Sequence, residues 1–174
     1  MKNKFLSVII AVSLAAVSAA NAALTTFDLA WSGVGNGATA TGSITFDTSL
    51  VNNPGYNDTS STWAVTSLDV EISGTAGSAG DGIFSLGGDI FDAILFALAP
   101  VDFGSELVGQ AGFIDFNVFG SSISGSAANV FKVLATDEDL KLTSFKASVP
   151  DHGSTLALFG LGLAGLGFIR RKIG

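Results

Sequence analysis

Apolar and polar residues alternate through the middle of this chain, between residues 23 and 148. Apolar side chains recur at every second position in four stretches, which is the period of a β-strand with one buried and one solvated face. Sheets with one wet face are typically antiparallel. The pattern therefore predicts antiparallel strands in the stretches 26–32, 39–47, 67–72 and 114–118.

Turn-forming residues separate these stretches. Glycine and asparagine tolerate a positive φ, and Pro54 presets a turn. Short strands at such spacing favour two packed sheets. We therefore predict an all-β body, an antiparallel β-sandwich of jelly-roll-like form over residues 23–148. The predicted turns are residues 33–37, 52–61, 74–82, 87–88 and 120–126.

Residues 89–99 are an apolar run that suits either a buried central strand or one short helix. We favour the strand, because two glycines precede the run and Pro100 follows it. A last strand is expected over 140–149, entered through a turn at 136–139.

The N-terminus has the order of a secretory signal peptide over residues 1–22. Two lysines precede an apolar run over residues 5–17, and Ala20 and Ala22 then form an A-x-A site that predicts cleavage before Ala23. The alternative is an uncleaved N-terminal anchor, which the short apolar run disfavours. Export of the body is expected.

Charge and cysteine content limit the possible functions. Between residues 23 and 149 the chain holds three lysines, no arginine and fourteen acidic residues, a net charge of −11. Such a surface repels phosphate backbones, so we expect no nucleic-acid partner. The chain has no cysteine, which removes disulfides, thiol catalysis and thiolate metal sites.

Catalytic residues are also scarce. The one histidine, His152, lies outside the body, so a Ser-His-Asp triad or a histidine-held metal is not expected there. A glycosidase would need only two carboxylates, but nothing marks two of the acids as a pair. We predict a non-enzymatic protein with no catalytic residue and no cofactor.

Calcium and glycans remain as candidate ligands. Asp137 and Asp139 are weak calcium candidates, as is the loop over 47–58, although neither has EF-hand spacing. Trp31 is expected in the core, whereas Tyr56 and Trp63 are either packed at an edge or exposed as a platform for a sugar ring. Asn57 opens a glycosylation sequon.

The C-terminal 26 residues differ from the body. Residues 153–169 carry no charge and would span about 25 Å as a helix. A basic cluster follows and would hold that end in the cytoplasm, with the body outside. The segment predicts one C-terminal transmembrane helix that serves as a temporary anchor; a permanent anchor is the alternative. The basic residues are Arg170, Arg171 and Lys172.

This order of motif, glycine-rich apolar helix and basic cluster closely resembles the PEP-CTERM protein-sorting signal, in its Val-Pro-Asp-x-Gly variant. His152 and Gly153 stand where the usual motif has its second proline. The resemblance covers residues 149–174. The motif residues are Val149, Pro150, Asp151, Gly153 and Ser154.

The resemblance implies sorting by an exosortase-type processing enzyme that cuts near the motif in a Gram-negative bacterium. The expected product is an exported, non-enzymatic structural protein of the cell surface or of the exopolysaccharide-rich biofilm matrix. Its expected partners are that enzyme, the membrane for a limited time, and exopolysaccharide. The alternative is a secreted glycan-binding module, stabilised by calcium.

Overall fold

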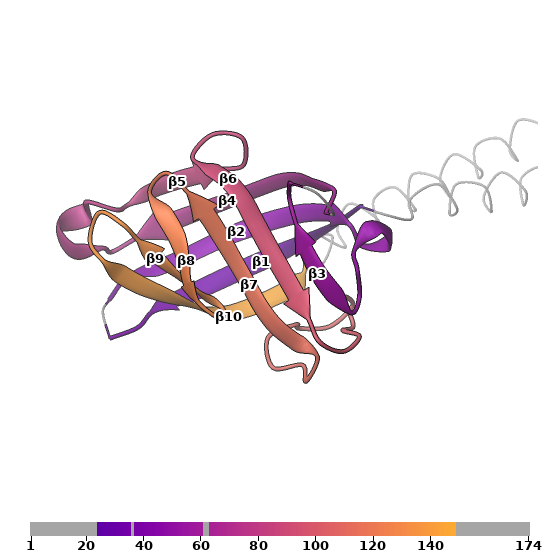
Figure 1. The fold of residues 1–174 in the computed structure, drawn as a ribbon. Coiled ribbons are helices and arrows are strands. Elements are labelled where there is room, and N and C mark those ends of the chain that lie inside the picture. The colour runs from indigo at the N-terminus through magenta and orange to yellow at the C-terminus, as the bar shows by residue number, and fades with distance from the viewer. Residues whose placement is uncertain (1–23, 36, 61–62, 149–174) are drawn as a thin grey trace, which may run out of the picture.

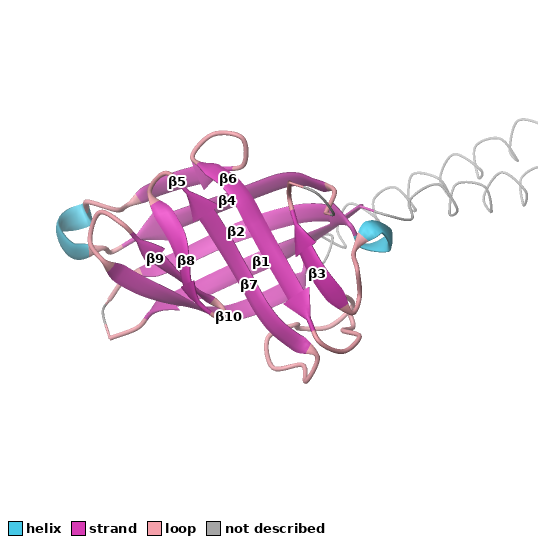
Figure 2. Cartoon of the chain, in the orientation of Figure 1, coloured by secondary structure: helices cyan, strands magenta, loops and turns pink. Residues whose placement is uncertain are grey.

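The computed structural model describes residues 24–35, 37–60 and 63–148, and these fold into two antiparallel sheets (Figure 1). The larger sheet has the strand order β5-β4-β2-β1-β10-β9-β8 and the smaller has the order β3-β6-β7. The prediction of an all-β body is confirmed, since the described residues contain only two helical turns of three residues each (Figure 2). The strands are β1 Leu24–Gly33, β2 Thr39–Asp47, β3 Gly55–Asp58, β4 Val65–Ser73, β5 Gly82–Ser85, β6 Ile90–Ala97, β7 Phe113–Gly120, β8 Ile123–Ala127, β9 Val130–Val133 and β10 Glu138–Ala147; the turns are η1 Thr48–Leu50 and η2 Ala76–Ser78.

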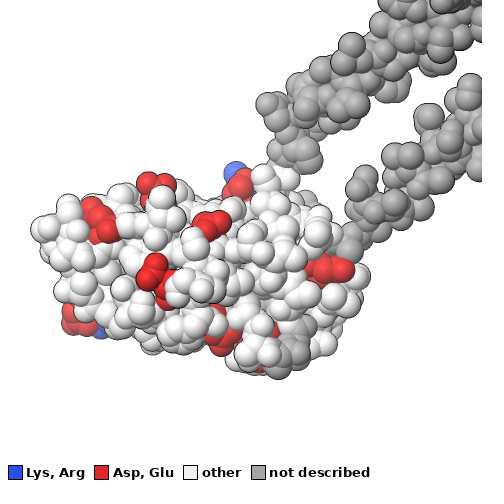
Figure 3. Space-filling view, turned by 90° about the horizontal axis from the view of Figure 1, so that it is seen from above, with Lys and Arg blue, Asp and Glu red and all other residues white. Residues whose placement is uncertain are grey.

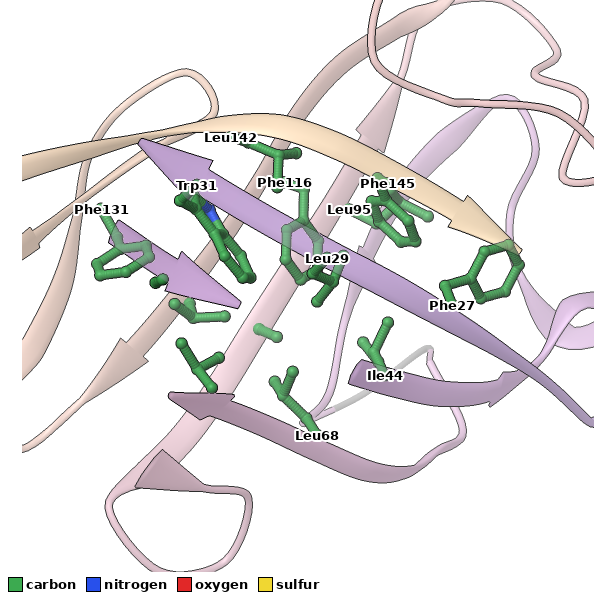
Figure 4. Packing of buried hydrophobic residues seen from close by; sticks show 14 of the residues in the cluster. Phe27, Leu29, Trp31, Ile44, Leu68, Leu95, Phe116, Phe131, Leu142 and Phe145 are labelled. Carbon is green, nitrogen blue, oxygen red and sulfur yellow. The ribbon is translucent and has the colours of Figure 1, made fainter. Parts of the chain in front are cut away.

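The small sheet lies across one face of the large sheet, and the two share one apolar core (Figure 1). Phe116 of β7 joins the layers, with its ring centroid 6.2 Å from that of Trp31 on β1 and 5.0 Å from that of Phe145 on β10. Phe27 and Phe46 stack at 4.7 Å within the large sheet. Figure 4 shows the side chains of Trp31, Phe116 and Phe145 close together in this core. Aromatic packing of this kind adds to the hydrophobic stabilisation.

The chain passes from the small sheet into the large one at the corner between β7 and β8. Asn129 closes this seam, because its side chain accepts a hydrogen bond from the Phe116 amide at 2.9 Å and donates to the Ile114 carbonyl oxygen at 2.8 Å. The Asn129 side chain thus makes the two backbone hydrogen bonds that a neighbouring strand would make with this part of β7. The Asn129 amide donates to Asp115 Oδ1 at 2.6 Å.

The four alternating stretches are confirmed as strands β1, β2, β4 and β7. Residues 89–99 also contain a strand, β6, so the helix alternative is wrong. The strand is not buried on both faces, however: Ile90 and Leu95 are buried while Phe91 is 68% exposed. The small sheet therefore keeps one face toward solvent.

Two of the predicted turns contain strands instead. The segment 52–61 includes β3, and the segment 120–126 includes most of β8. Both strands have only four or five residues, and pairing with neighbours rather than local preference holds them extended. Gly125 permits the close approach of β8 to β7, since a Cβ there would lie 2.7 Å from the Phe119 ring.

In the alternating stretch 114–118, Asn117 has the position of a solvated residue, yet it is buried, at 5% exposure. The reason is β8, which covers this end of β7. The Asn117 side chain donates to Asp115 Oδ1 at 2.9 Å and to the Ala127 carbonyl oxygen at 2.8 Å. A buried amide needs such partners, so the alternating pattern here marks the seam and not a wet face.

The expected last strand is confirmed as β10, which lies between β1 and β9 in the interior of the large sheet. Among the described residues no helix is long and apolar enough to cross a membrane. The predicted signal peptide (residues 1–22) and the predicted transmembrane helix (residues 153–169) lie outside the described residues.

Candidate functional site

The junction between the body and the C-terminal motif is set by the pairing of the first and last strands. Phe27 of β1 is opposite Ala147 of β10, and the Ser148 amide donates to the Thr26 carbonyl oxygen at 2.8 Å. The ladder therefore continues to the residue before Val149. Both described ends of the body lie at the same end of the molecule (Figure 1), and the motif follows the last strand directly in sequence.

The residues of the predicted processing sites lie outside the described residues, and their roles stay predictions. These are the signal-cleavage residues Ala20, Ala22 and Ala23, the motif residues Val149, Pro150, Asp151, Gly153 and Ser154, and the basic cluster Arg170, Arg171 and Lys172.

The calcium candidates Asp137 and Asp139 each have a protein partner. Asp137 Oδ1 lies 2.6 Å from Lys132 Nζ, and this hydrogen bond raises the pKa of the lysine. Asp139 Oδ1 accepts a hydrogen bond from the Ser126 hydroxyl at 2.9 Å. In the part of the chain that the structure describes, no group of three acidic or histidine side chains is placed to hold a metal ion.

The second calcium candidate, the loop over 47–58, is held together by its own side chains. Asn57 is fully buried, and its carboxamide oxygen accepts a hydrogen bond from the Asn52 amide at 2.7 Å. Asp47 accepts from the Ser49 amide and caps η1. The sequon asparagine is therefore a structural side chain within this loop.

The structure decides between the alternatives left open for the aromatic residues. Trp31 is in the core, as expected, at 3% exposure. Trp63 is not an exposed platform: it is 4% exposed and packs edge-on to Phe46 at 4.9 Å. Tyr56 is 51% exposed. Of the two sugar-platform candidates, only Tyr56 is accessible.

Tyr56 belongs to a surface that the sequence pattern did not reveal. In the small sheet, Tyr56 of β3 is directly opposite Phe96 of β6, which is opposite Asp115 of β7. Residues directly opposite on antiparallel strands point to the same face, and residues two apart on one strand do so as well. The same register adds Asn117 and Phe119, but both lie against β8. We call the rest of the set the aromatic–acidic face: Tyr56, Asp58, Asp92, Ile94, Phe96 and Asp115.

The outer face of the large sheet has a different character. A shallow groove of about 480 Å³ there is lined by Asp28, Asp69 and Glu71 with the hydroxyls of neighbouring strands. The register places Ser43 between Asp28 and Asp69, so these two acids lie about 10 Å apart at the usual strand spacing. Figure 3 shows acidic side chains scattered over another view of the surface, with few basic ones.

The C-terminal segment of the chain is similar to a known protein family. Residues 148–173 match the family described as the VPDSG-CTERM motif, a PEP-CTERM-like variant of a sorting signal. The match confirms the resemblance seen in the sequence and indicates export, transient membrane anchoring and processing by a sorting enzyme. No curated protein and no solved structure matches the chain.

Proposed function

Because the chain carries a VPDSG-CTERM sorting signal at residues 148–173, we propose that it is the cargo of an exosortase-type enzyme. The enzyme cuts near Pro150 and Asp151, and the β-rich body is delivered to the cell surface or the extracellular matrix. There the body acts as a structural protein and not as an enzyme. The sorting motif is the observation that carries this proposal.

Features of the body support a non-enzymatic role. Its sequence has neither histidine nor cysteine, which leaves carboxylates as the acid–base groups for catalysis near neutral pH. The acids of the shallow groove on the large sheet line an open sheet face. Glycosidases instead place their two carboxyl groups on either side of a bound sugar. A net charge of −11 between residues 23 and 149 suits a hydrated surface protein.

The junction geometry supports processing in place. β10 is hydrogen-bonded along the sheet up to Ser148, so cleavage beyond this residue removes nothing from the described core. The processed chain keeps every strand and the complete aromatic cluster. A cut at the motif therefore releases or re-attaches an intact body.

The experiment is fractionation of host cells that express the natural chain or a variant with Val149, Pro150 and Asp151 replaced by alanine. The natural chain is expected in the surface or medium fraction, and the triple variant in the inner membrane. Ser148→Ala is the matched control, because the Thr26 hydrogen bond uses its backbone amide. A triple variant that is sorted like the natural chain would contradict the proposal.

A further inference from the structure

We propose that the aromatic–acidic face binds an amine-bearing polysaccharide, with sugar rings packed on Tyr56 and Phe96 and ammonium groups beside the three carboxylates. This inference rests on the proposed function, since it names the ligand class that the exported body would meet at a cell surface or in a matrix. The face looks toward the viewer in Figure 1, where no described segment lies in front of β3 and β6. On β7, β8 lies against the positions of Asn117 and Phe119.

The aromatic part of the face is a cross-strand pair. Tyr56 and Phe96 are directly opposite each other on β3 and β6, and the side chains of such a pair are in contact distance. Tyr56 is 51% exposed, while Phe96 is half-buried beside it. Sugar rings have apolar C–H faces, and an exposed ring of this kind offers a flat apolar surface with a polar hydroxyl at its edge.

The acidic part surrounds this pair. Asp115 is opposite Phe96 on the other side, and Asp58 lies two residues beyond Tyr56 on the same face of β3. Partial burial, followed by the charges of Asp58, Asp92 and Asp115, raises the pKa of the Tyr56 hydroxyl. All three carboxylates are therefore within electrostatic reach of the ring.

Hydrogen bonds orient all three carboxylates. Asp58 Oδ1 accepts from the Ser60 amide at 2.9 Å and from the Ser60 hydroxyl at 2.6 Å. Asp92 Oδ1 accepts from the Thr59 amide at 3.1 Å and from its hydroxyl at 2.5 Å. Asp115 Oδ1 accepts from the Asn117 side chain and from the Asn129 amide. These four hydrogen bonds to Asp92 and Asp115 all use Oδ1 and hold the two carboxylates in place on the face.

Charge complementarity selects the ligand class. The strands β3, β6 and β7 carry these three acids and not one lysine or arginine, so their charge has no counter-charge on its own sheet. An anionic polysaccharide would be repelled by this acidic face, and a neutral one would gain nothing from its charge. Ammonium groups form charge-assisted hydrogen bonds with carboxylates and also favour an aromatic face.

The test is calorimetric titration of the protein purified from its host with a glucosamine hexamer at mildly acidic pH and low salt. The N-acetylglucosamine hexamer and a lysine hexamer are the comparison probes. We expect the glucosamine hexamer to bind most tightly of the three, with affinity that falls as salt is added.

The variants separate stacking from charge. Tyr56→Ala is expected to weaken glucosamine-hexamer binding about tenfold, while Tyr56→Phe keeps the ring and stays within about twofold. Asp92→Asn keeps an oxygen that accepts the hydrogen bonds from Thr59 but removes the charge. We expect this variant to bind the hexamer more weakly and with a smaller dependence on salt. Ile83→Ala, which removes an exposed apolar side chain from the large sheet, is the matched control and is expected to bind like the natural protein.

Several results would overturn the inference: no binding of the glucosamine hexamer, equal binding of the N-acetylated hexamer, or equal binding of the lysine hexamer with no effect of Tyr56→Ala. These outcomes are separate from failure of the proposed function. If the chain is sorted normally but binds no glucosamine hexamer, only the proposed ligand is wrong. If it binds the hexamer but is not sorted, the proposed surface function is wrong.

Discussion

The outer faces of the two sheets are both polar in sequence, yet they use their polar groups differently. On the large sheet, side chains bond to one another across strands: the Thr26 and Thr45 hydroxyls are 2.8 Å apart, and Ser85 donates to Asp69 at 2.5 Å. On the small sheet, Asp92 and Asp115 bond back to a loop and to the seam. The large sheet thus pairs polar side chains on its own surface, whereas the small sheet has an exposed Tyr56 beside half-buried Phe96 among acids.

This difference shows that alternation alone does not define the role of a solvated sheet face. The inward side chains of both sheets belong to the same core. A substitution at an inward position therefore destabilises both sheets, whereas one at an outward position changes the surface of a single sheet. The comparison can be broken at the core, at the seam, at a loop or at the surface, in decreasing order of expected effect.

The largest effect is expected from Phe116→Ala, which removes the ring that joins the two sheets. The side chain is fully buried between Trp31 and Phe145, and such truncations cost about 3–5 kcal/mol. Phe91→Ala is the matched control, because this phenylalanine is 68% exposed on the same small sheet. Urea unfolding measures both; equal losses would contradict a core shared by the two sheets.

The next effect is expected at the seam. Asn129 has a φ of +59°, so Asn129→Gly keeps the backbone relaxed while removing both side-chain hydrogen bonds to β7. We expect the free energy of unfolding to fall by about 2 kcal/mol, because the Phe116 amide and the Ile114 carbonyl oxygen lose their partner. A loss below about 0.5 kcal/mol would show that the corner between β7 and β8 is closed by packing alone.

Glu106 provides a smaller, pH-dependent effect beside the last strand. Burial opposes its ionisation, but hydrogen bonds from the Ser144 hydroxyl and the Phe145 and Val108 amides, together with nearby Lys146, lower the pKa of its carboxyl overall. A pKa that is lower in the folded state stabilises the fold above the unfolded-state value of about 4.3, and this stabilisation disappears as pH falls through the folded-state pKa.

Glu106→Gln tests this effect, since the amide oxygen still accepts hydrogen bonds. At neutral pH we expect a loss of about 1 kcal/mol, limited because the side chain is exposed to solvent. The difference between the variant and the natural protein should shrink in urea unfolding as the solution is acidified. A difference that does not change with pH would contradict the role given to the charge.

The smallest effect is expected on the large sheet's surface. Ser85→Ala removes the hydroxyl that bonds to exposed Asp69, and we expect a change in the free energy of unfolding within about 0.5 kcal/mol. The same variant should leave glucosamine-hexamer binding unchanged. Weaker binding of the hexamer by Ser85→Ala would remove the distinction between the two outer faces.

The long strands were predictable from the sequence because their inward positions are apolar over several alternations, as in Phe27, Leu29 and Trp31. The short strands β3 and β8 were not, since their extended form depends on partners distant in sequence and their residues favour turns. The sequence left Trp63 open between edge packing and exposure, because its burial comes from packing on Phe46 and Phe116 and not from any local pattern.

The candidate surface was predictable only in part. The sequence offered exposure of Tyr56 only as one of two alternatives, whereas the sorting motif followed from its order of residues. The gathering of Phe96, Asp92 and Asp115 around Tyr56 depends on the register of three strands. The alternation along one strand predicts which side chains share a face, but it does not predict which residues of other strands lie opposite them.

The central claim is that the chain is sorted cargo, and intact-mass and C-terminal peptide mass spectrometry test it most directly. The protein is isolated from its own host, with and without the exosortase-type enzyme. We predict a chain that ends near Pro150 and Asp151 only when the enzyme is present. A chain that retains Arg170, Arg171 and Lys172 in cells with the enzyme would contradict the account.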